Sequence, residues 1–287
     1  MPIDVTKLLA FDIPSVRQHV APRDAAFYAL SVGFGQDPLD LRQLDFVDPD
    51  TALKVVPTMA LVTAHPGFWM AEEGSGIDPS AVLHADQSIE CLGDLPINGV
   101  VTSDTKIVGL VDKGAGKAAL VRTETMIRDT AGTDIARLRR TIFIRNGGGF
   151  GGENEAPQPL SPPPDREADH VVEFPIRPEQ ALYYRLNGDM NPLHSDPRSA
   201  RQAGFDRPIL HGLCTFGFAC HAALRTLARY DVSRLKALSG RFSGVVFPGE
   251  TLRVELWNSG EFLARVTERN MIVLEDGRAM LDRAEGN

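Results

Sequence analysis

The sequence lacks several features that would each identify a class of protein. Its three cysteines, Cys91, Cys214 and Cys220, are too few for a disulfide framework, and none has the Cys-x-x-Cys spacing of a zinc ribbon. Residues 1–4 show no basic region leading into an apolar run, so we expect no signal peptide. The longest uncharged stretch worth testing, residues 208–224, is shorter than the roughly 20 residues that a membrane span needs. We therefore expect a cytoplasmic protein with reduced thiols and no membrane partner.

A surplus of positive charge is also absent. The chain has 30 Lys and Arg against 38 Asp and Glu, a net charge of −8. Binding to nucleic acid without sequence preference needs a basic surface, so we expect no nucleic-acid partner. Any anionic ligand must be bound by a few well-placed cations or by backbone amides. With 287 residues, 43% of them hydrophobic, the chain can form one large core or two small ones.

A change in composition divides the chain near its middle. The glycine-rich segment 147–152 is followed by five prolines between residues 157 and 164. We predict an N-terminal half over residues 1–150, a linker over 151–170 and a C-terminal half over 171–287. The segment 147–152 fits Gly-x-Gly-x-x-Gly, but no helical pattern follows it, so a dinucleotide-binding fold is rejected.

The two halves share a short sequence pattern. Tyr28-Ala29-Leu30 and Tyr184-Arg185-Leu186 each follow a helix-like run, over 22–29 and 178–186, and each precedes a glycine and an Asp/Asn-Pro-Leu sequence. Chance could produce so short a match, so a duplicated domain is a hypothesis. The second copy holds Asp189, Asn191 and His194, whereas the first holds the apolar Phe34. This difference is expected if only one copy kept the chemistry.

Alternating apolar and polar residues predict strands in both halves. The N-terminal half shows them over 117–128 and 135–144. The C-terminal half shows them over 252–257, 263–269 and 271–275, with turns at 259–260 and 276–277. Between them, residues 208–229 are apolar on every side, which indicates a buried helix. We predict an α+β fold in which each half is an antiparallel sheet wrapped on a helix.

Residues 184–194 (YRLNGDMNPLH) carry the strongest local signal. Gly188 permits an unusual backbone turn, and Pro192 keeps the preceding residue out of helical geometry. Asp189, Asn191 and His194 would then bring three proton-handling or hydrogen-bonding groups to one constrained loop. The alternative is a plain turn, because Asp and Asn are common in turns and His194 could cap the next helix.

A second signal stands at the start of the predicted buried helix. Gly212 removes side-chain bulk at the first helical turn, where free amides can meet a developing negative oxygen. The alternative is that Gly212 only allows close packing and that His211 is a hydrogen-bonded core histidine.

Together the two motifs resemble the (R)-specific 2-enoyl-CoA hydratases, also called hydratase 2 or MaoC-like dehydratases. The layout is similar to the hydratase 2 domain of peroxisomal multifunctional enzymes. The resemblance implies a double hot-dog fold and reversible addition of water to trans-2-enoyl-CoA, giving (3R)-3-hydroxyacyl-CoA. It implies that Asp189 and His194 are the catalytic dyad, that Asn191 positions them and that the Gly212 amide holds the thioester oxygen.

The resemblance also implies residues that bind the acyl-CoA. These are His84, Ala85, Lys113, Met190, Pro192, Leu193 and Phe242. Lys113, with the amides of the glycine-rich segment, is expected near the CoA phosphates, although the residue alone also fits a solvated turn lysine. The family's usual His-Gly-Glu-Gln reads His84-Ala85-Asp86-Gln87 here, so the acyl-chain preference stays open.

Several functional alternatives remain at this point. A hot-dog thioesterase would hydrolyse the same kind of substrate, a dehydratase would run the reaction in reverse on a specialised acyl-CoA, and a non-catalytic acyl-CoA binder would not need the Asp189–His194 pair. No cofactor is expected, because CoA is part of the substrate. No metal is expected either, since His65, His84, His194 and His211 lack ligand spacing. We expect a homodimer.

Overall fold

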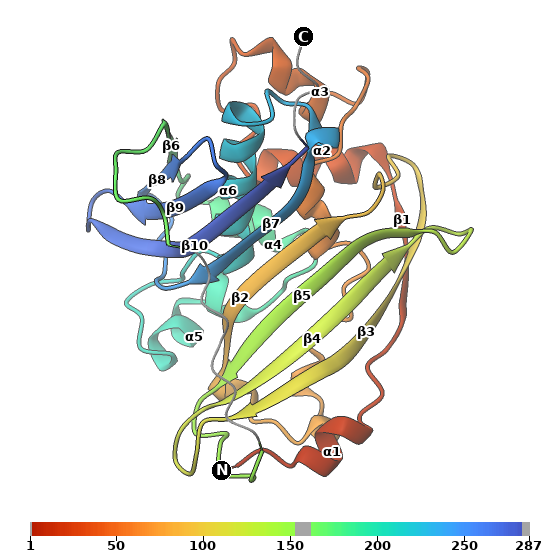
Figure 1. Cartoon of the computed structure of the whole chain (residues 1–287), viewed down its shortest axis with the longest axis vertical. Coiled ribbons are helices and arrows are strands. Elements are labelled where there is room, and N and C mark those ends of the chain that lie inside the picture. The colour runs from red at the N-terminus through yellow and green to blue at the C-terminus, as the bar shows by residue number, and fades with distance from the viewer. Residues whose placement is uncertain (1, 153–161, 283–287) are drawn as a thin grey trace.

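The strands form one antiparallel sheet that runs through both halves of the chain. The computed structural model describes residues 2–152 and 162–282, so residues 153–161 of the predicted linker lie outside the described residues. The sheet has ten strands in the order β1-β3-β4-β5-β2-β7-β10-β9-β8-β6 (Figure 1). Their bounds are β1 Val16–Val20, β2 Val82–Cys91, β3 Gly99–Asp112, β4 Ala119–Arg128, β5 Asp134–Ile144, β6 His170–Pro175, β7 Leu235–Phe242, β8 Thr251–Leu256, β9 Glu261–Val266 and β10 Met271–Leu281.

The halves meet where β2 pairs with β7. The pairing runs from Asp86 opposite Arg241 to Glu90 opposite Ala237. Five strands of the N-terminal half thus lie on one side of this junction and five of the C-terminal half on the other. The predicted α+β class is confirmed, and the two predicted sheets are joined edge to edge.

The helices are short, with one exception. The α-helices are α1 Val5–Ala10, α2 Pro22–Ser31, α3 Leu44–Val47, α4 Gln180–Arg185, α5 Pro197–Gln202 and α6 Gly212–Thr226. The 3₁₀ helices are η1 Leu41–Gln43, η2 Pro57–Leu61, η3 Trp69–Ala71, η4 Glu73–Ser75, η5 Pro79–Ala81, η6 Pro192–His194 and η7 Val232–Arg234. No helix among the described residues is long and apolar enough to cross a membrane.

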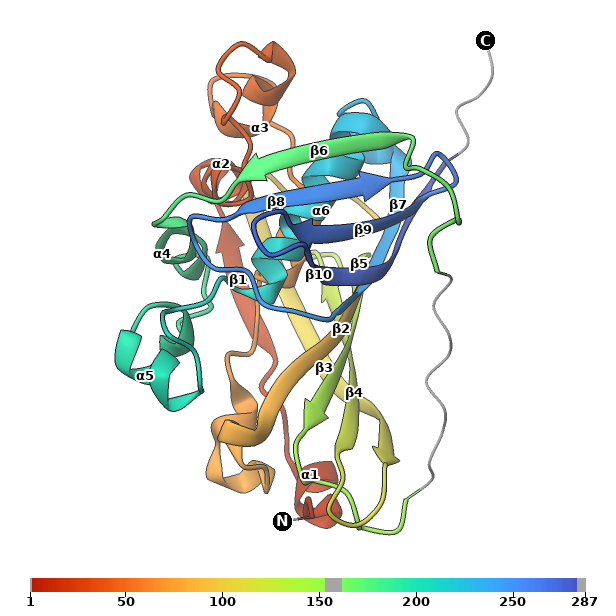
Figure 2. The ribbon, with the colours of Figure 1, turned by 90° about the vertical axis from the view of Figure 1, so that its left-hand side faces the viewer.

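Helix α6 forms the centre of the C-terminal half. Strands β6–β10 curve round it (Figure 2), and each residue from 213 to 224 is buried. A Cβ on Gly217 would lie 2.5 Å from Cγ1 of Val32, so glycine here allows close approach of the segment that follows α2. A helix that is apolar all round is stable only in such a fully enclosed position.

The N-terminal half has no α-helix of that length among its described residues. Its longest, α2, has ten residues, and the 3₁₀ helix η2 contacts β2 and β5. At the far end of the sheet, α1 and the Trp69–Ala71 turn cover Val121, Ile142 and Ile144 in a second hydrophobic cluster. The inner face of the N-terminal sheet is therefore covered by several short segments.

The predicted strands are largely confirmed, and one predicted turn is wrong. Strands β4 and β5 form the expected hairpin, and β8, β9 and β10 lie where the alternation placed them. Asp276-Gly277 does not end a strand, because β10 continues to Leu281 with a register shift between Glu275 and Arg278. These two residues form an irregularity, which absorbs the φ of +50° at Asp276 without reversing the chain. The buried helix begins at Gly212 and ends at Thr226, inside the predicted 208–229.

Candidate active site

The loop between α4 and α5 holds the predicted catalytic residues, and its own backbone fixes its path. Gly188 has a φ of +123°, a conformation that favours glycine. Asn191 is extended, as expected before a proline, and its Oδ1 accepts the N–H of Leu193 at 3.0 Å. The Asn191 N–H in turn donates to Oδ1 of Asp189 at 3.2 Å. Asn191 therefore supports the Asp189 carboxylate through the backbone.

His194 is buried at the end of this loop, and one hydrogen bond fixes its tautomer. Its Nδ1 lies 2.9 Å from the carbonyl oxygen of Ile209. A carbonyl can only accept, so Nδ1 carries the proton and Nε2 of the neutral ring presents a lone pair. Burial lowers the pKa of His194, with the hydrogen bond to Ile209 acting in the opposite direction. His194 is therefore set up as a proton acceptor at neutral pH.

His211, which the sequence interpretation left as a possible core residue, belongs to the same cluster. Its ring stacks on that of His194, with centroids 3.7 Å apart. Its Nε2–H donates to the backbone oxygen of Asp189 at 3.2 Å, and its Nδ1 has no hydrogen-bond partner among the described residues. Burial and the neighbouring His194 lower its pKa to about 3. His211 could have been predicted as a site residue from its position directly before the glycine with which α6 begins.

Asp189, His194 and His211 each bring one ligand-type atom to a common space. These atoms lie within 4.8 Å of one another, a spacing that a water molecule can bridge. In the described part of the chain this is the one group of three such residues that could hold a metal ion. The chemistry of a carboxylate beside two neutral imidazoles is proton transfer, and the expectation of no metal stays a prediction.

Gly212, Phe242 and His84 form a row beside this cluster. Gly212 is the first residue of α6, so its N–H belongs to the amides that a helix leaves without an internal acceptor. A Cβ on Gly212 would lie 3.2 Å from the Phe242 ring, and the Phe242 and His84 rings are 4.8 Å apart. The structure thus brings together three residues that lie far apart in the sequence.

Comparison with known proteins identifies the family. Residues 19–146 match the MFE-2 hydratase 2 N-terminal domain, and residues 159–276 match the MaoC like domain. The chain is 40% identical over 282 residues to the enoyl-CoA hydratase ChsH3 of Mycobacterium tuberculosis, covering 96% of this chain and 97% of the relative. It is 39% identical to the peroxisomal enoyl-CoA hydratase 2 of Arabidopsis thaliana, covering 93% and 92%. The chain belongs to the MaoC-like, enoyl-CoA hydratase 2 family of lyases.

Solved structures support the same fold. A MaoC-like dehydratase from Phytophthora capsici superposes with a TM-score of 0.85 at 31% identity, covering 98% of both chains. A more distant M. tuberculosis protein, described as a double hot-dog fold, matches with a TM-score of 0.58 at 16% identity and covers 94% of both chains. The predicted double hot-dog fold of this family member is confirmed.

The residues expected to line the substrate path differ in exposure. Met190 and Pro192 are exposed on the catalytic loop, and Leu193 is half-buried. Ala85 lies where the pairing of β2 with β5 shifts register, between His84 and Asp86. The methyl group that departs from the family pattern therefore sits on a β-bulge, a feature that redirects neighbouring side chains. The roles of all these residues stay predictions.

Lys113 and the glycine-rich segment lie at one end of the N-terminal sheet, near α1 (Figures 1 and 2). Asp112 pairs with Ala119, which pairs with Ile144, which pairs with Val82, so Lys113 lies at the same sheet end as His84, across about 14 Å. The expected binding of the CoA phosphates by the glycine-rich amides conflicts with hydrogen bonds that these amides already form. The N–H groups of Gly149 and Gly151 each donate to the Asp112 carboxylate at 2.7 Å. These bonds lower the Asp112 pKa to about 2, so the carboxylate holds the two amides in this structure.

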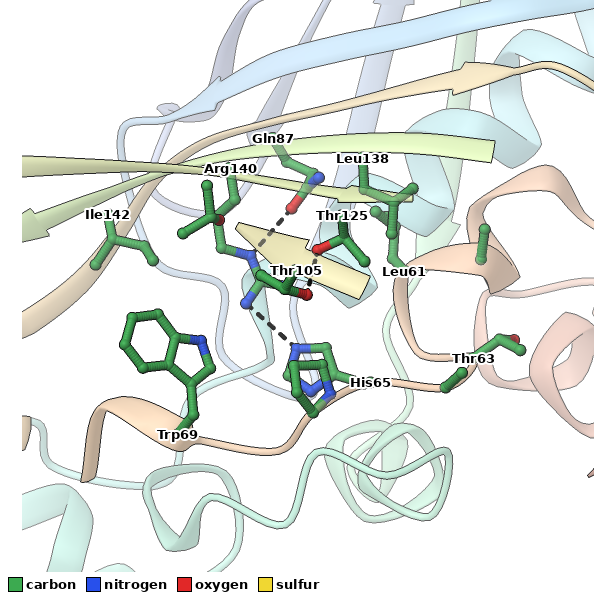
Figure 3. Close-up of a pocket in the computed structure, with 14 residues that line it drawn as sticks. Leu61, Thr63, His65, Trp69, Gln87, Thr105, Thr125, Leu138, Arg140 and Ile142 are labelled. Atoms are coloured by element: carbon green, nitrogen blue, oxygen red, sulfur yellow. Dashed lines mark hydrogen bonds between the residues drawn. The ribbon is translucent and has the colours of Figure 1, made fainter. Parts of the chain in front are cut away.

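Sequence reasoning missed a polar cavity on the inner face of β2–β5 (Figure 3). Arg140 and His65 lie in it. Burial lowers the pKa of both side chains, and the negative charge of Asp189 opposes that shift. Arg140 could have been found from its place between Leu138 and Ile142, because alternate residues of a strand share a face. The expected homodimer and cytoplasmic location of this family member stay predictions.

Proposed function

We propose that this chain catalyses the reversible addition of water to trans-2-enoyl-CoA, giving (3R)-3-hydroxyacyl-CoA. The observation that carries the proposal is the meeting of the Asp189 carboxylate and the His194 imidazole with His211, the residue directly before the first amide of α6. Hydration requires groups that take a proton from water and deliver it to C2, and a donor that stabilises an enolate-like oxygen. This cluster offers both.

The proton transfers follow from the hydrogen bonds of the two residues. A water molecule bound between the Asp189 carboxylate and Nε2 of His194 is polarised by two acceptors. As its oxygen bonds to C3 of the substrate, one of its protons passes to the dyad. The pair holds a carboxylate and a neutral imidazole, so it has no acidic proton of its own at the start. The proton that reaches C2 is therefore the one taken from water, and atoms and charge balance.

The backbone amide of Gly212 would hold the thioester oxygen. Negative charge builds up on that oxygen when the C2–C3 double bond is attacked, and an amide at a helix N-terminus stabilises it. Phe242 and His84, which follow Gly212 in a row, would flank the thioester end of the acyl group. His84 is neutral there, since burial lowers its pKa well below the ordinary value. We further propose that Lys113 contacts the CoA phosphates.

The test is hydration of crotonyl-CoA by Asp189→Ala, with Asp37→Ala as the control. Asp37 is exposed in the corresponding loop of the N-terminal half, where it accepts the N–H of Leu39. We expect Asp189→Ala to lose about three orders of magnitude in kcat with its circular dichroism unchanged, and Asp37→Ala to keep wild-type turnover. Near-normal hydration by Asp189→Ala would contradict the proposed mechanism.

The same assay separates hydration from thioester hydrolysis. A hydratase consumes the enoyl absorbance without releasing thiol, whereas a thioesterase releases free CoA that a thiol reagent detects. We expect no thiol release above background and a product of R configuration on chiral analysis. Thiol release at the rate of enoyl loss would favour the thioesterase alternative.

A further inference from the structure

The cavity on the inner face of the N-terminal sheet has a chemistry that the reaction above does not use. The cavity is small, with a volume of about 30 Å³ inside a hollow of about 430 Å³ that includes open solvent, and the segment 60–69 faces the strands across it (Figure 3). Its wall includes leucine and isoleucine side chains, but also eight that can form hydrogen bonds: Thr63, His65, Trp69, Gln87, Thr105, Thr123, Thr125 and Arg140. A hydrocarbon tail gains nothing from such groups, so the cavity is shaped for something polar.

Arg140 is the only arginine or lysine among the residues that line this cavity, and it forms no ion pair with a carboxylate of the described residues, although the Asp189 charge acts on it from a longer distance. Its Nε donates to Oε1 of Gln87 and its Nη1 contacts Nε2 of His65, both at 3.3 Å. Within residues 2–152 and 162–282, no carboxylate lies within 4.0 Å of this guanidinium. On the opposite face of the same strand, Arg137 bonds to Glu90 and Arg139 to Glu124. The inward-facing arginine therefore differs from its neighbours in having no directly bonded carboxylate, at a place where desolvation makes a charge without a hydrogen-bonded partner costly.

His65 provides an independent observation that points to a missing acceptor. The Gly67 N–H donates to Nδ1 of His65 at 3.0 Å, so Nδ1 carries no proton. Nε2 must then carry the proton of the ring. This N–H faces the N–H of Arg140 Nη1, so two donors meet with no acceptor between them. An anionic oxygen placed against both would satisfy the two donors at once.

The cavity adjoins the proposed reaction centre. The Asp189 charge acts on Arg140 and on His65, and the Arg140 charge acts on His84. The segment that closes the cavity also contacts the catalytic loop, since a Cβ on Gly188 would lie 4.0 Å from the carbonyl oxygen of Val62. An acyl chain with its thioester end at Gly212 and its C2 and C3 at Asp189 and His194 could therefore direct its far end toward Arg140.

We propose that Arg140 and His65 bind a carboxylate at the far end of the acyl group, so that the preferred substrates are enoyl-CoA esters of dicarboxylic acids. Arg140 supplies the charge and a planar pair of donors that match a carboxylate. His65 adds one N–H, and the threonine hydroxyls complete the polar surroundings. The proposal rests on the hydratase function proposed above and names its substrate class.

The test compares pairs of substrates that differ only at the far end. The pairs are trans-2-hexenoyl-CoA with trans-2-hexenedioyl-CoA, and the corresponding octenoyl and decenoyl compounds. We expect the wild-type chain to show the higher kcat/KM for the carboxylate-ended member of at least one pair. We expect Arg140→Gln to lower kcat/KM for that substrate about thirtyfold or more, as for loss of one partner of an enclosed charge pair, and to leave the methyl-ended partner unchanged.

Arg139→Gln is the matched control, because it removes an arginine from the adjacent position on the outer face. We expect it to leave the kcat/KM of both substrates unchanged. Arg140→Lys keeps the charge but loses the planar donor pair, so we expect an intermediate loss confined to the carboxylate-ended substrate. Arg140→Lys also serves as the test variant if Arg140→Gln does not fold.

Three outcomes are distinguishable. Equal loss for both substrates in Arg140→Gln and Arg140→Lys would mean that Arg140 acts on Asp189 or on the fold, and would overturn the substrate proposal alone. A wild-type preference for the methyl-ended member of every pair would overturn it as well. Hydration of none of the substrates by the wild-type chain would overturn the proposed function itself.

Discussion

The loops that follow α2 and α4 start from similar sequences and serve different purposes. In both, the residue before the proline caps a turn through its side-chain oxygen: Asp37 Oδ1 accepts the Leu39 N–H at 3.1 Å, and Asn191 Oδ1 accepts the Leu193 N–H at 3.0 Å. The two tyrosines that precede the loops, Tyr28 and Tyr184, are fully buried, with ring centroids 6.1 Å apart. The shared pattern thus forms the contact between the halves.

The difference lies in what each loop puts after its tyrosine. The first loop inserts Phe34, which stacks on His221 at 3.7 Å and packs against Phe46. At the position of His194 it has Asp40, which bonds to Arg42 and accepts from the hydroxyl of Tyr230. These bonds hold the pKa of Asp40 at about 2. One loop therefore satisfies its polar groups within the fold, whereas the other brings together a carboxylate and a ring nitrogen that we propose act on the substrate.

The largest expected effect separates the two loops by activity. We expect His194→Ala to lower kcat for crotonyl-CoA by about three orders of magnitude, because it removes half of the proton-handling pair. Asp40→Ala should keep kcat within a factor of about two and lower the free energy of unfolding by about 1–2 kcal/mol, through loss of the cap and its hydrogen bonds. Steady-state kinetics and urea unfolding measure the two effects. Loss of turnover in Asp40→Ala would remove the distinction.

The second effect is on stability alone. Phe34→Ala deletes a fully buried ring between His221 and Phe46, and we expect it to cost about 3–5 kcal/mol of unfolding free energy. Leu193→Ala, in the corresponding stretch of the second loop, removes a half-buried side chain and should cost about 1 kcal/mol or less. Equal destabilisation in urea unfolding would show that both loops are structural.

Local patterns allowed the catalytic loop and α6 to be predicted from the sequence. The glycine and proline that fix the loop, Gly188 and Pro192, lie only four positions apart in the chain, and the apolar run of α6 is continuous, so neither depends on distant contacts. The strands β4 and β5 could also be predicted, because one face of their hairpin is solvated and apolar and polar residues therefore alternate along each strand.

Long-range contacts set the limit of the prediction. The bond between Asp112 and the amides of Gly149 and Gly151 joins segments more than 35 residues apart. That Arg140 bonds to Gln87 and His65 and to no carboxylate of the described residues is visible only when β5, β2 and residue 65 are placed together. The turn predicted at 276–277 failed for a similar reason: the pairing of β10 with both of its neighbours decides whether Asp-Gly reverses a chain or makes a bulge.

A smaller effect concerns the glycine of each loop. Gly33 and Gly188 both have positive φ, but a Cβ on Gly33 would lie 2.3 Å from the Phe218 ring, whereas the nearest atom to a Cβ on Gly188 is 4.0 Å away. We expect Gly188→Ala to cost about 1 kcal/mol of backbone strain and Gly33→Ala about 2–3 kcal/mol, because it adds a clash to the strain. Urea unfolding of both variants measures the difference. The opposite order would mean that the first loop is the less tightly packed one.

The last comparison concerns the pH dependence of stability, through two buried histidines, His221 in α6 and His211 at its N-cap. Burial lowers the pKa of His211 and of His221 to about 3, from an ordinary value near 6.5. Between these values the unfolded chain binds a proton at each position and the folded chain does not. Stability must therefore fall as pH decreases through this window, by about 1.4 kcal/mol per pH unit for each histidine.

His221 lies under the first loop, where its Nδ1–H donates to the Val32 carbonyl at 3.2 Å, and His211 lies under the second. Replacing either by Asn should reduce the slope of unfolding free energy against pH by about 1.4 kcal/mol per pH unit between pH 6 and 4, which corresponds to one proton fewer taken up on unfolding. Only His211→Asn should also lower turnover, because the proposed reacting groups, Asp189 and His194, belong to the second loop alone. An unchanged slope in both variants would mean that these imidazoles are protonated in the folded chain. Loss of turnover in a stable His221→Asn variant would mean that the first loop takes part in the chemistry after all.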